Sequence, residues 1–272
     1  MLKKDLKKLR GDLLEQALGK LEELDRRNNE IYSKLNELEN KIDAVINRLS
    51  LSEDIITTKA VDFLVPNAPR DDRQEQLLQL QTAPDQYMLE DLDKYLGMDS
   101  TILDIGAAIG THSIYWAKTT KAKKIYAFEP VYYRILETNI EINNLQDRVK
   151  IFKFGLGDKS SQAKIKFLKH NVISSASLEE NTDWAGISIY ALDDIDEIKK
   201  EEKIDFVKID VEGMEKYVLK GGKQTLSKHS PVVFYVASAG EYQYTYNFLK
   251  KLGYEEPIVL STDNYLFIHK RV

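Results

Sequence analysis

The sequence predicts an α/β domain built on a mostly parallel sheet and preceded by an N-terminal coiled-coil helix. Over the first fifty residues, apolar side chains recur at the heptad spacing of coiled coils. From residue 101 onward, short apolar segments alternate with longer amphipathic ones, which is typical of parallel strands covered by helices on both faces. We therefore expect a coiled-coil oligomerisation helix over 1–50, a connector over 51–84 and a second domain over 85–272.

The overall composition excludes several classes of function. The 272-residue chain has a formal net charge of −5, which gives no bulk attraction to nucleic acid or to anionic lipid. It has no cysteine, so disulfides, thiolate metal sites and a cysteine nucleophile are excluded. No apolar run reaches membrane-spanning length and the N-terminus lacks a signal-peptide core, so we expect no transmembrane segment and a cytoplasmic location.

The N-terminal heptads also predict how the helices associate. With Leu14 at position a, ten of the eleven a and d positions are apolar. In chain order, these positions are Leu14, Ala17, Leu21, Leu24, Asn28, Ile31, Leu35, Leu38, Ile42, Val45 and Leu49. Every g position is basic while Asp25 and Glu39 stand at e, which favours a parallel homo-oligomer, with a dimer preferred over a trimer and Asn28 fixing the register. A single helix packed on its own domain would explain the apolar spacing but not the basic g row.

The second domain is expected to begin with an amphipathic helix over 85–96 and then to alternate between strands and helices. Strands are predicted at 101–105, 124–128, 148–154, 204–210, 231–237 and 264–269, and helices at 109–118, 131–144, 212–220 and 241–252. Residues 155–190 form an insertion between the third and fourth strands. It should contain two hairpin strands at 163–168 and 186–190, and a Ser-rich loop at 173–177 near the mouth of a site.

A glycine-rich turn after the first main strand predicts a nucleoside site. The segment Asp104–Gly110 reads D-x-G-x-x-x-G, and glycine at 106 and 110 allows close approach of the backbone to a ligand. Glu129 ends the next strand, where a carboxylate can accept hydrogen bonds from two ribose hydroxyls. The spacing differs from the G-x-G-x-x-G of dinucleotide folds, and no Lys-Ser or Lys-Thr of a phosphate-binding loop follows.

Further acids stand at the carboxyl ends of other predicted strands, where ligands bind in such sheets. Asp104, Glu129, Asp158 and Asp210 all lie at or just beyond a strand end, and Glu212 follows two residues after Asp210. Asp210 and Glu212 could orient a substrate hydroxyl, take its proton or hold a divalent cation. The alternative is that they cap the following helix.

Five motifs together resemble the FkbM-type methyltransferases, which are S-adenosylmethionine-dependent enzymes with the class I Rossmann-like fold. The motifs are Ile102–Ser113, Ala127–Pro130, Gly155–Asp158, Leu192–Asp194 and Lys208–Gly213, in the order of the family. The resemblance implies that 85–272 is a methyltransferase domain. It also implies that Asp104, Gly106, Ala107 and Gly110 form the loop around the methionine part of the cofactor. Glu129 would bind the ribose, and Asp158 would lie near the adenine amine. Asp210 and Glu212 would be catalytic residues that face the methyl group and the acceptor.

Members of this family typically methylate hydroxyl groups of sugars or natural products, so the resemblance implies an O-methyltransferase acting on a saccharide, with Asp210 as the base. The coiled coil could hold several sites on one long acceptor, or bind a partner glycosyltransferase. Two departures keep a second interpretation open: Ala108 replaces the usual Asn, and the strand after Pro231 lacks a late Glu. The alternative is a degenerate, non-enzymatic cofactor-binding module on an assembly rod. An NAD-linked oxidoreductase fits Glu129 but not the glycine spacing.

Overall fold

The computed structural model describes residues 20, 23, 26–27, 31, 34, 55–57, 61–65, 74, 86–167, 176–180, 186–237 and 240–271. The chain divides into two units, Met1–Glu53 and Asp54–Val272. In the first unit, the described residues are helical, and Arg27 forms an ion pair with Glu23 one turn away at 2.8 Å. Ile31, a predicted core position of the coiled coil, is helical and exposed. The other predicted a and d positions lie outside the described residues.

The second unit is built on a mostly parallel sheet, as the alternating pattern predicted. Within the described residues this sheet has seven strands in the order β12-β13-β11-β10-β3-β4-β5. Their bounds are β3 Thr101–Ile105, β4 Lys124–Phe128, β5 Val149–Phe152, β10 Phe206–Ile209, β11 Val232–Val236, β12 Ile258–Val259 and β13 Asn264–Phe267. The five strands from β11 to β5 are parallel, and β13 runs antiparallel to β11. The chain order reverses between β3 and β10, and ligands bind at the carboxyl ends of strands beside such a switch point.

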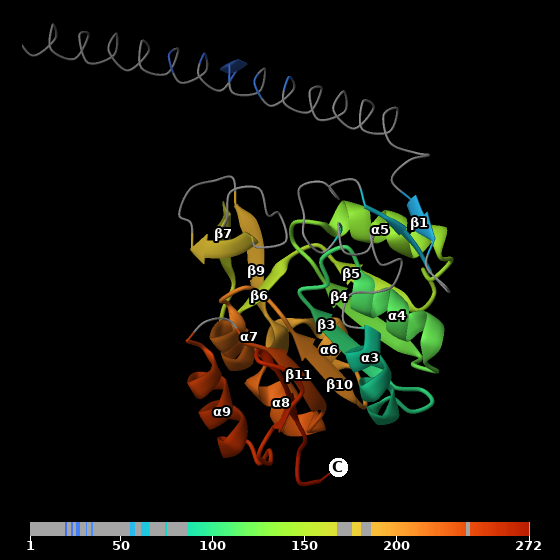
Figure 1. Ribbon diagram of the computed structural model, residues 1–272. Helices are drawn as coiled ribbons and strands as arrows, with labels where there is room; N and C mark the ends of the chain where they lie inside the picture. Colours follow the sequence, from blue (N-terminus) through green and yellow to red (C-terminus); the bar gives the residue numbers. More distant parts are fainter. Residues whose placement is uncertain are drawn as a thin grey trace, which may run out of the picture. The chain divides into compact units, whose positions relative to one another are not determined.

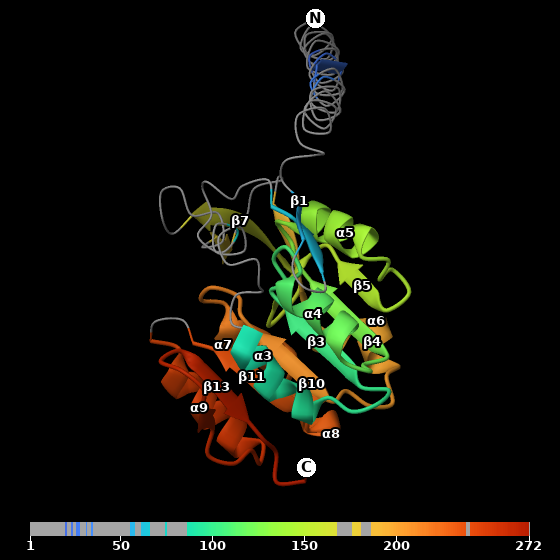
Figure 2. The same ribbon diagram turned by 45° about the vertical axis from the view of Figure 1, so that its right-hand side comes forward.

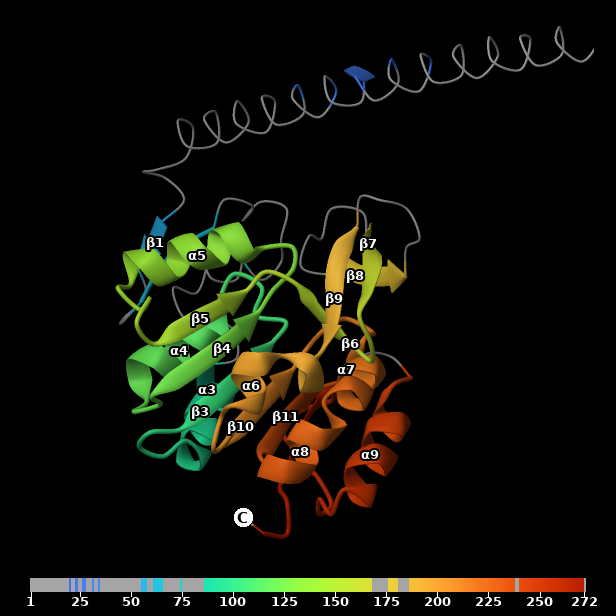
Figure 3. The same ribbon diagram turned by 180° about the vertical axis from the view of Figure 1, so that it is seen from behind.

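Helices cover both faces of this sheet (Figures 1 and 3). One face packs against α3 (Gln86–Leu92), α4 (Thr111–Thr119) and α5 (Tyr133–Ile142). The other packs against α6 (Asp196–Lys199), α7 (Glu215–Gly221), α8 (Lys223–His229) and α9 (Tyr242–Lys251). Successive strand residues alternate between the two cores, so Ile102 packs with the first set and Leu103 with the second. The apolar runs of the strands are therefore buried on both sides.

The insertion after β5 forms a second, smaller sheet in the order β6-β9-β7-β8. Its strands are β6 Gly155–Gly157, β7 Ser161–Phe167, β8 Ala176–Glu180 and β9 Ile187–Ala191. The two predicted hairpin segments pair, since β7 is antiparallel to β9. β8 corrects the prediction of a Ser-rich loop over 173–177, because Ala176 and Ser177 already belong to a strand that pairs with β7; residues 173–175 lie outside the described residues.

A short hairpin lies within the range predicted as a connector and packs on the second unit. It consists of β1 (Ile55–Thr57) and β2 (Asp62–Leu64), which are antiparallel. Val61, Phe63 and Val65 are buried in the core that also contains α5, and the hairpin lies beside α5 in Figure 2. The regular structure of the second unit thus begins about thirty residues before the predicted helix of 85–96, which is observed as α3 followed by the short helix η2 (Asp93–Tyr95).

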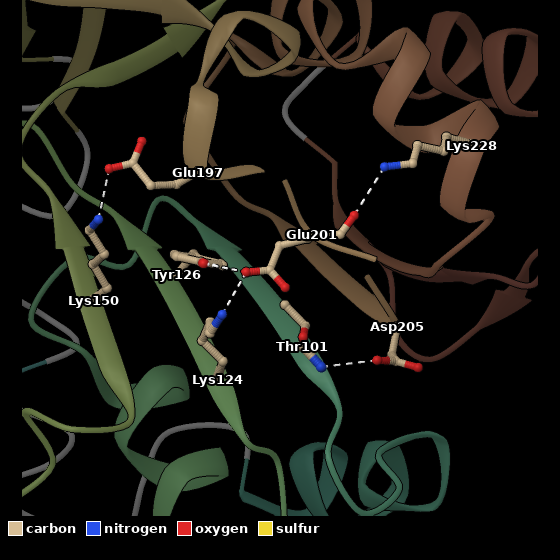
Figure 4. A network of polar contacts seen from close by, with 8 residues as sticks. All are labelled: Thr101, Lys124, Tyr126, Lys150, Glu197, Glu201, Asp205 and Lys228. Carbon is tan, nitrogen blue, oxygen red and sulfur yellow. Dashed lines mark hydrogen bonds and ion pairs between the residues drawn. The ribbon is translucent and has the colours of Figure 1, made fainter. Parts of the chain in front are cut away.

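A polar network holds the amino ends of the strands together (Figure 4). Glu201 accepts hydrogen bonds from Lys124 and Tyr126 of β4, and Asp205 accepts one from the Thr101 backbone N–H at 2.9 Å. Burial raises the pKa of Glu201, but the hydrogen bonds from Lys124 and Tyr126 outweigh it and leave this pKa below its usual value. These contacts lie at the opposite end of the sheet from the acids that the sequence singled out.

No helix among the described residues has the length and apolar character that crossing a membrane requires.

Candidate cofactor-binding and catalytic site

A pocket opens at the carboxyl ends of β3, β4 and β10, beside the switch point of the sheet. Its walls are the turn after β3, the segment after β4, the start of β6 and the turn after β10. The described residues lining it are Gln74, Ile105, Gly106, Ala107, Ala108, Ile109, Thr111, His112, Phe128, Glu129, Pro130, Val131, Tyr132, Gly155, Leu156, Lys208, Asp210, Val211, Glu212 and Met214. Carboxylates and backbone groups therefore meet in one concave site.

The turn after β3 has its shape because of two glycines and one alanine. Gly106 has a φ of 83°, and a Cβ at this position would lie 1.8 Å from the Asp210 carbonyl oxygen, so no other residue fits between the two turns. A Cβ on Gly110, whose φ is 95°, would meet Leu136 of α5 at 2.6 Å. Ala108 lies between them with a φ of 49°, in the left-handed region that asparagine and glycine tolerate better than alanine.

Glu129 joins the two walls of the pocket through backbone hydrogen bonds. Its Oε1 accepts from the N–H groups of Val131 and Tyr132 at 2.7 and 2.9 Å, and Oε2 accepts from Ala108 N–H at 2.8 Å. Burial raises the pKa of Glu129, and these N–H donors only partly offset that effect. A carboxylate has about four lone-pair sites, so these three N–H donors use most of the accepting capacity of Glu129.

A buried lysine lies beneath the pocket and joins β3 to β10. Lys208 is opposite Asp104 in the strand register, and its Nζ is 3.1 Å from Asp104 Oδ1 and 3.9 Å from Asp210 Oδ2. The same Nζ donates to the Gly106 carbonyl at 2.8 Å. Asp104 also accepts from the Ser113 hydroxyl at 2.6 Å. Lys208 therefore connects the glycine turn, its supporting carboxylate and the candidate base.

The turn after β10 holds the second pair of acids in a strained backbone. Glu212 has a φ of 50° and Gly213 a φ of 102°, and such left-handed residues outside glycine cluster at functional sites. The N-cap of α7 is Met214, which makes no side-chain capping hydrogen bond, and Glu215 accepts from Gly213 N–H at 3.0 Å. Asp210 and Glu212 thus lie ahead of the helix cap, which argues against the interpretation that they are capping residues.

The structure brings most of the predicted site residues together. Gly106, Ala107, Glu129, Asp210 and Glu212 line the pocket. Asp104 lies beneath it, fully buried, and supports Lys208. Two other predicted residues do not line it, since Gly110 packs towards Leu136 and Asp158 is exposed on the turn after β6.

Three further residues at the site were not among the predicted cofactor-binding and catalytic residues. Lys208 is 1% exposed. Its position inside an apolar strand, between Asp205 and Asp210, is the sequence feature that could have identified it as a site residue. His112, at the start of α4, is buried with its ring 5.5 Å from that of Trp116. Gln74 also lines the pocket, although no motif in its part of the sequence predicted a site residue there. Across the described parts of the chain, no three His, Asp or Glu side chains form a group that could hold a metal ion.

We expect Glu129→Ala to weaken binding of S-adenosylhomocysteine by about 1.5–3 kcal/mol, the contribution of a hydrogen bond to a charged group. The affinity of the native chain should also fall as the pH drops through the raised pKa of Glu129, because protonation removes the accepting charge. Titration calorimetry measures both effects. Glu137→Ala is the matched control, since Glu137 pairs with Lys153 at the surface; unchanged affinity in folded Glu129→Ala would show that Glu129 does not bind the ribose.

The mostly parallel sheet with helices on both faces is a Rossmann-like α/β fold, and its acidic pocket lies at the switch point of the sheet. Comparison with known sequences then gives its family: residues 104–256 match the methyltransferase FkbM domain, and the chain belongs to this family. The family membership expected from the five motifs is thereby confirmed.

Individual relatives are more distant. The chain is 27% identical over 149 residues to "Methyltransferase 1" of Beauveria bassiana, a match that covers 45% of this chain and 58% of that protein. The crystal structure of an FkbM methyltransferase from Methylobacillus flagellatus is similar with a TM-score of 0.47 and 20% identity, covering 63% of this chain and 44% of the other. TrmK from M. capricolum, solved with S-adenosylhomocysteine, has a TM-score of 0.40 and 18% identity, covering 67% and 66%. The chain thus spans little more than half the length of the curated relative.

Proposed function

We propose that this chain is an S-adenosylmethionine-dependent methyltransferase that acts on a hydroxyl group, and that its acceptor is a saccharide. The observation that carries the proposal is the convergence of Glu129, Asp210 and Glu212 on one pocket beside the glycine turn. These three acids outnumber the single lysine among the described lining residues. An acidic pocket favours a ligand with a positive centre, and it disfavours the diphosphate of a dinucleotide.

The residues of the pocket suit transfer to a hydroxyl. S-adenosylmethionine supplies a methyl group on a positively charged sulfur, which is a good leaving group. The chain then has to align the acceptor and remove its proton. Asp210 is the base in this proposal, because Lys208 at 3.9 Å and the turn after β10 hold it at the pocket wall. Glu212, at the same wall, orients the acceptor hydroxyl.

Label transfer tests this function directly. The chain is incubated with methyl-labelled S-adenosylmethionine and a panel of neutral and acidic polysaccharides, and the label in the polymer is counted before and after mild alkali. A methyl ether survives alkali whereas a methyl ester does not, so alkali-stable label supports O-methylation of a hydroxyl. Alkali-labile label would move the acceptor to a carboxyl group. Cofactor binding without transfer to any hydroxyl-bearing acceptor would favour the degenerate module instead.

We also propose that residues 14–49 form a parallel coiled coil, most simply a dimer, which holds several catalytic domains together or binds a partner glycosyltransferase. The basic g row and Asn28 support this arrangement. The full chain should sediment as a dimer. A chain lacking residues 1–50 should be a folded monomer that still binds S-adenosylhomocysteine, since the second unit has its own cores. A full chain that is monomeric at micromolar concentration would contradict the coiled coil.

A further inference from the structure

An aromatic and basic surface extends from the pocket along α7. Met214 lines the pocket and is the N-cap residue of α7. Tyr217 N–H donates to the Met214 carbonyl at 3.0 Å, so Tyr217 lies one helical turn beyond the pocket wall. Lys220 comes three residues later, about 9 Å from Met214 along the helix axis. Tyr217 is half-buried and Lys220 is exposed, so a long ligand with one unit in the pocket can reach both.

α9 lies beside α7 and supplies a second aromatic ring to this surface (Figures 1 and 3). Lys216 of α7 donates to Glu241, the N-cap residue of α9, at 3.2 Å, which joins the starts of the two helices. The Nζ of Lys220 lies 5.5 Å from the ring centre of Tyr217 and 5.7 Å from that of Tyr244 on α9. Tyr217, Lys220 and Tyr244 are called the α7–α9 surface below.

Lys220 gives the α7–α9 surface a positive charge. In the described part of the chain Lys220 forms no ion pair with an acid, whereas its neighbour Lys216 is paired with Glu241. The electron-rich faces of Tyr217 and Tyr244 attract the Lys220 ammonium and hold it between the two helices. An exposed ammonium that is fixed in this way and has no acidic partner is suited to an anionic group on a ligand.

The pocket and the α7–α9 surface carry charges of opposite sign. The acids Glu129, Asp210 and Glu212 line the pocket, with Lys208 as the lysine among the described lining residues. These acids disfavour a negative charge on the unit that receives the methyl group. Lys220, two helical turns along α7, favours a negative charge. The two together match a neutral reacting unit with an anionic neighbour, which is a charge pattern that a polysaccharide with acidic units provides.

We propose that the α7–α9 surface binds an anionic group of the acceptor polysaccharide, on a unit next to the one that is methylated. Lys220 pairs with the anionic group, and Tyr217 and Tyr244 are positioning residues that hold Lys220 in place. This inference rests on the proposed function, because it takes a saccharide as the acceptor. It narrows that acceptor to an acidic polysaccharide whose methylated unit is uncharged.

Initial rates of label transfer test the part assigned to Lys220. On the polysaccharide of the panel that takes up most label, Lys220→Gln should raise KM about tenfold and leave kcat and S-adenosylhomocysteine affinity unchanged. The reason is that the contact is the same before and during methyl transfer. Added salt should raise the KM of the native chain, and should raise that of Lys220→Gln less, because salt screens the ion pair.

Lys250→Gln is the matched control. Lys250 also lies over a tyrosine ring, that of Tyr246, but it is in the last turn of α9 and pairs with Glu256 at 2.9 Å. Its substitution should leave KM and the salt dependence as in the native chain. An equal rise of KM in Lys250→Gln and Lys220→Gln would show a general effect of surface charge and would overturn the proposal.

Two variants of Tyr244 test the positioning role. Tyr244→Ala removes a ring that holds Lys220, so it should raise KM and add little to Lys220→Gln in the double variant. Tyr244→Phe keeps the ring and should restore the native KM. A native KM in Lys220→Gln, or a neutral polysaccharide as the best acceptor, would overturn the inference. Binding of S-adenosylhomocysteine without label transfer to any saccharide would instead overturn the proposed function.

Discussion

Replacing Lys208 with methionine should lower the free energy of unfolding by about 3–5 kcal/mol, the usual cost of removing one partner of a buried ion pair. Asp104 is fully buried and Lys208 is 1% exposed, so the substitution leaves the Asp104 carboxylate without its counter-charge in the core. It also removes the hydrogen bond to the Gly106 carbonyl. Urea unfolding followed by circular dichroism measures the loss.

Lys124→Met provides the matched control for this variant. Lys124 forms an ion pair with Glu201 at 2.6 Å, but its side chain is 41% exposed, so the loss should be at most about 1 kcal/mol. Adding Asp104→Asn to Lys208→Met should restore part of the stability, because it removes the buried charge. If Lys208→Met lowers the free energy of unfolding no more than Lys124→Met does, the buried pair of Lys208 and Asp104 does not stabilise the base of the pocket.

Asp210→Asn should reduce methyl transfer by about 100- to 10,000-fold, the usual contribution of a general base, while leaving cofactor affinity nearly unchanged. The amide keeps the size of the side chain but cannot take a proton. Asp210 follows β10 and lines the pocket, whereas Asp205 precedes the same strand. Initial rates on the acceptor found by label transfer, with calorimetry on the same samples, measure the two effects.

Asp205→Asn is the control at the other end of β10. Asp205 accepts from Thr101 N–H and pairs with Lys203, so its substitution should affect stability slightly and the rate not at all. Wild-type turnover by Asp210→Asn would eliminate Asp210 as the base. A parallel fall in cofactor affinity and rate would make it a binding residue instead.

Six of the seven strands of the main sheet could be predicted from the sequence because they are largely apolar runs, as strands buried on both faces are. The seventh, β12, was missed because it has only two residues and both are exposed. β3 and β4 begin and end at the predicted residues. α8 was missed because only Thr225 and Leu226 of its seven residues are buried, which is too few to form a helical period. β1 and β2 have three residues each, so their alternation is too short to recognise.

Parts of the site were predictable for a similar reason. An acid that ends an apolar strand lies at the ligand-binding edge, which placed Glu129 and Asp210 at the pocket. Lys208 was not assigned a role, because the burial of a lysine depends on partners from another strand, here Asp104. The left-handed backbone of Ala108 has no signature in an alanine, and the place of Gln74 depends entirely on tertiary packing.

Titration of the full chain with S-adenosylhomocysteine and, separately, with NAD would show directly which ligand this pocket binds. We expect S-adenosylhomocysteine to bind with micromolar or tighter affinity, which corresponds to about −8 kcal/mol, and we expect Glu129→Ala, but not Glu137→Ala, to weaken that binding by about 1.5–3 kcal/mol. We expect no measurable binding of NAD, because the pocket walls carry the acids Glu129, Asp210 and Glu212, which repel its diphosphate. Binding of NAD in preference to S-adenosylhomocysteine, or binding of neither, would contradict the assignment of this pocket as the site of a methyl donor.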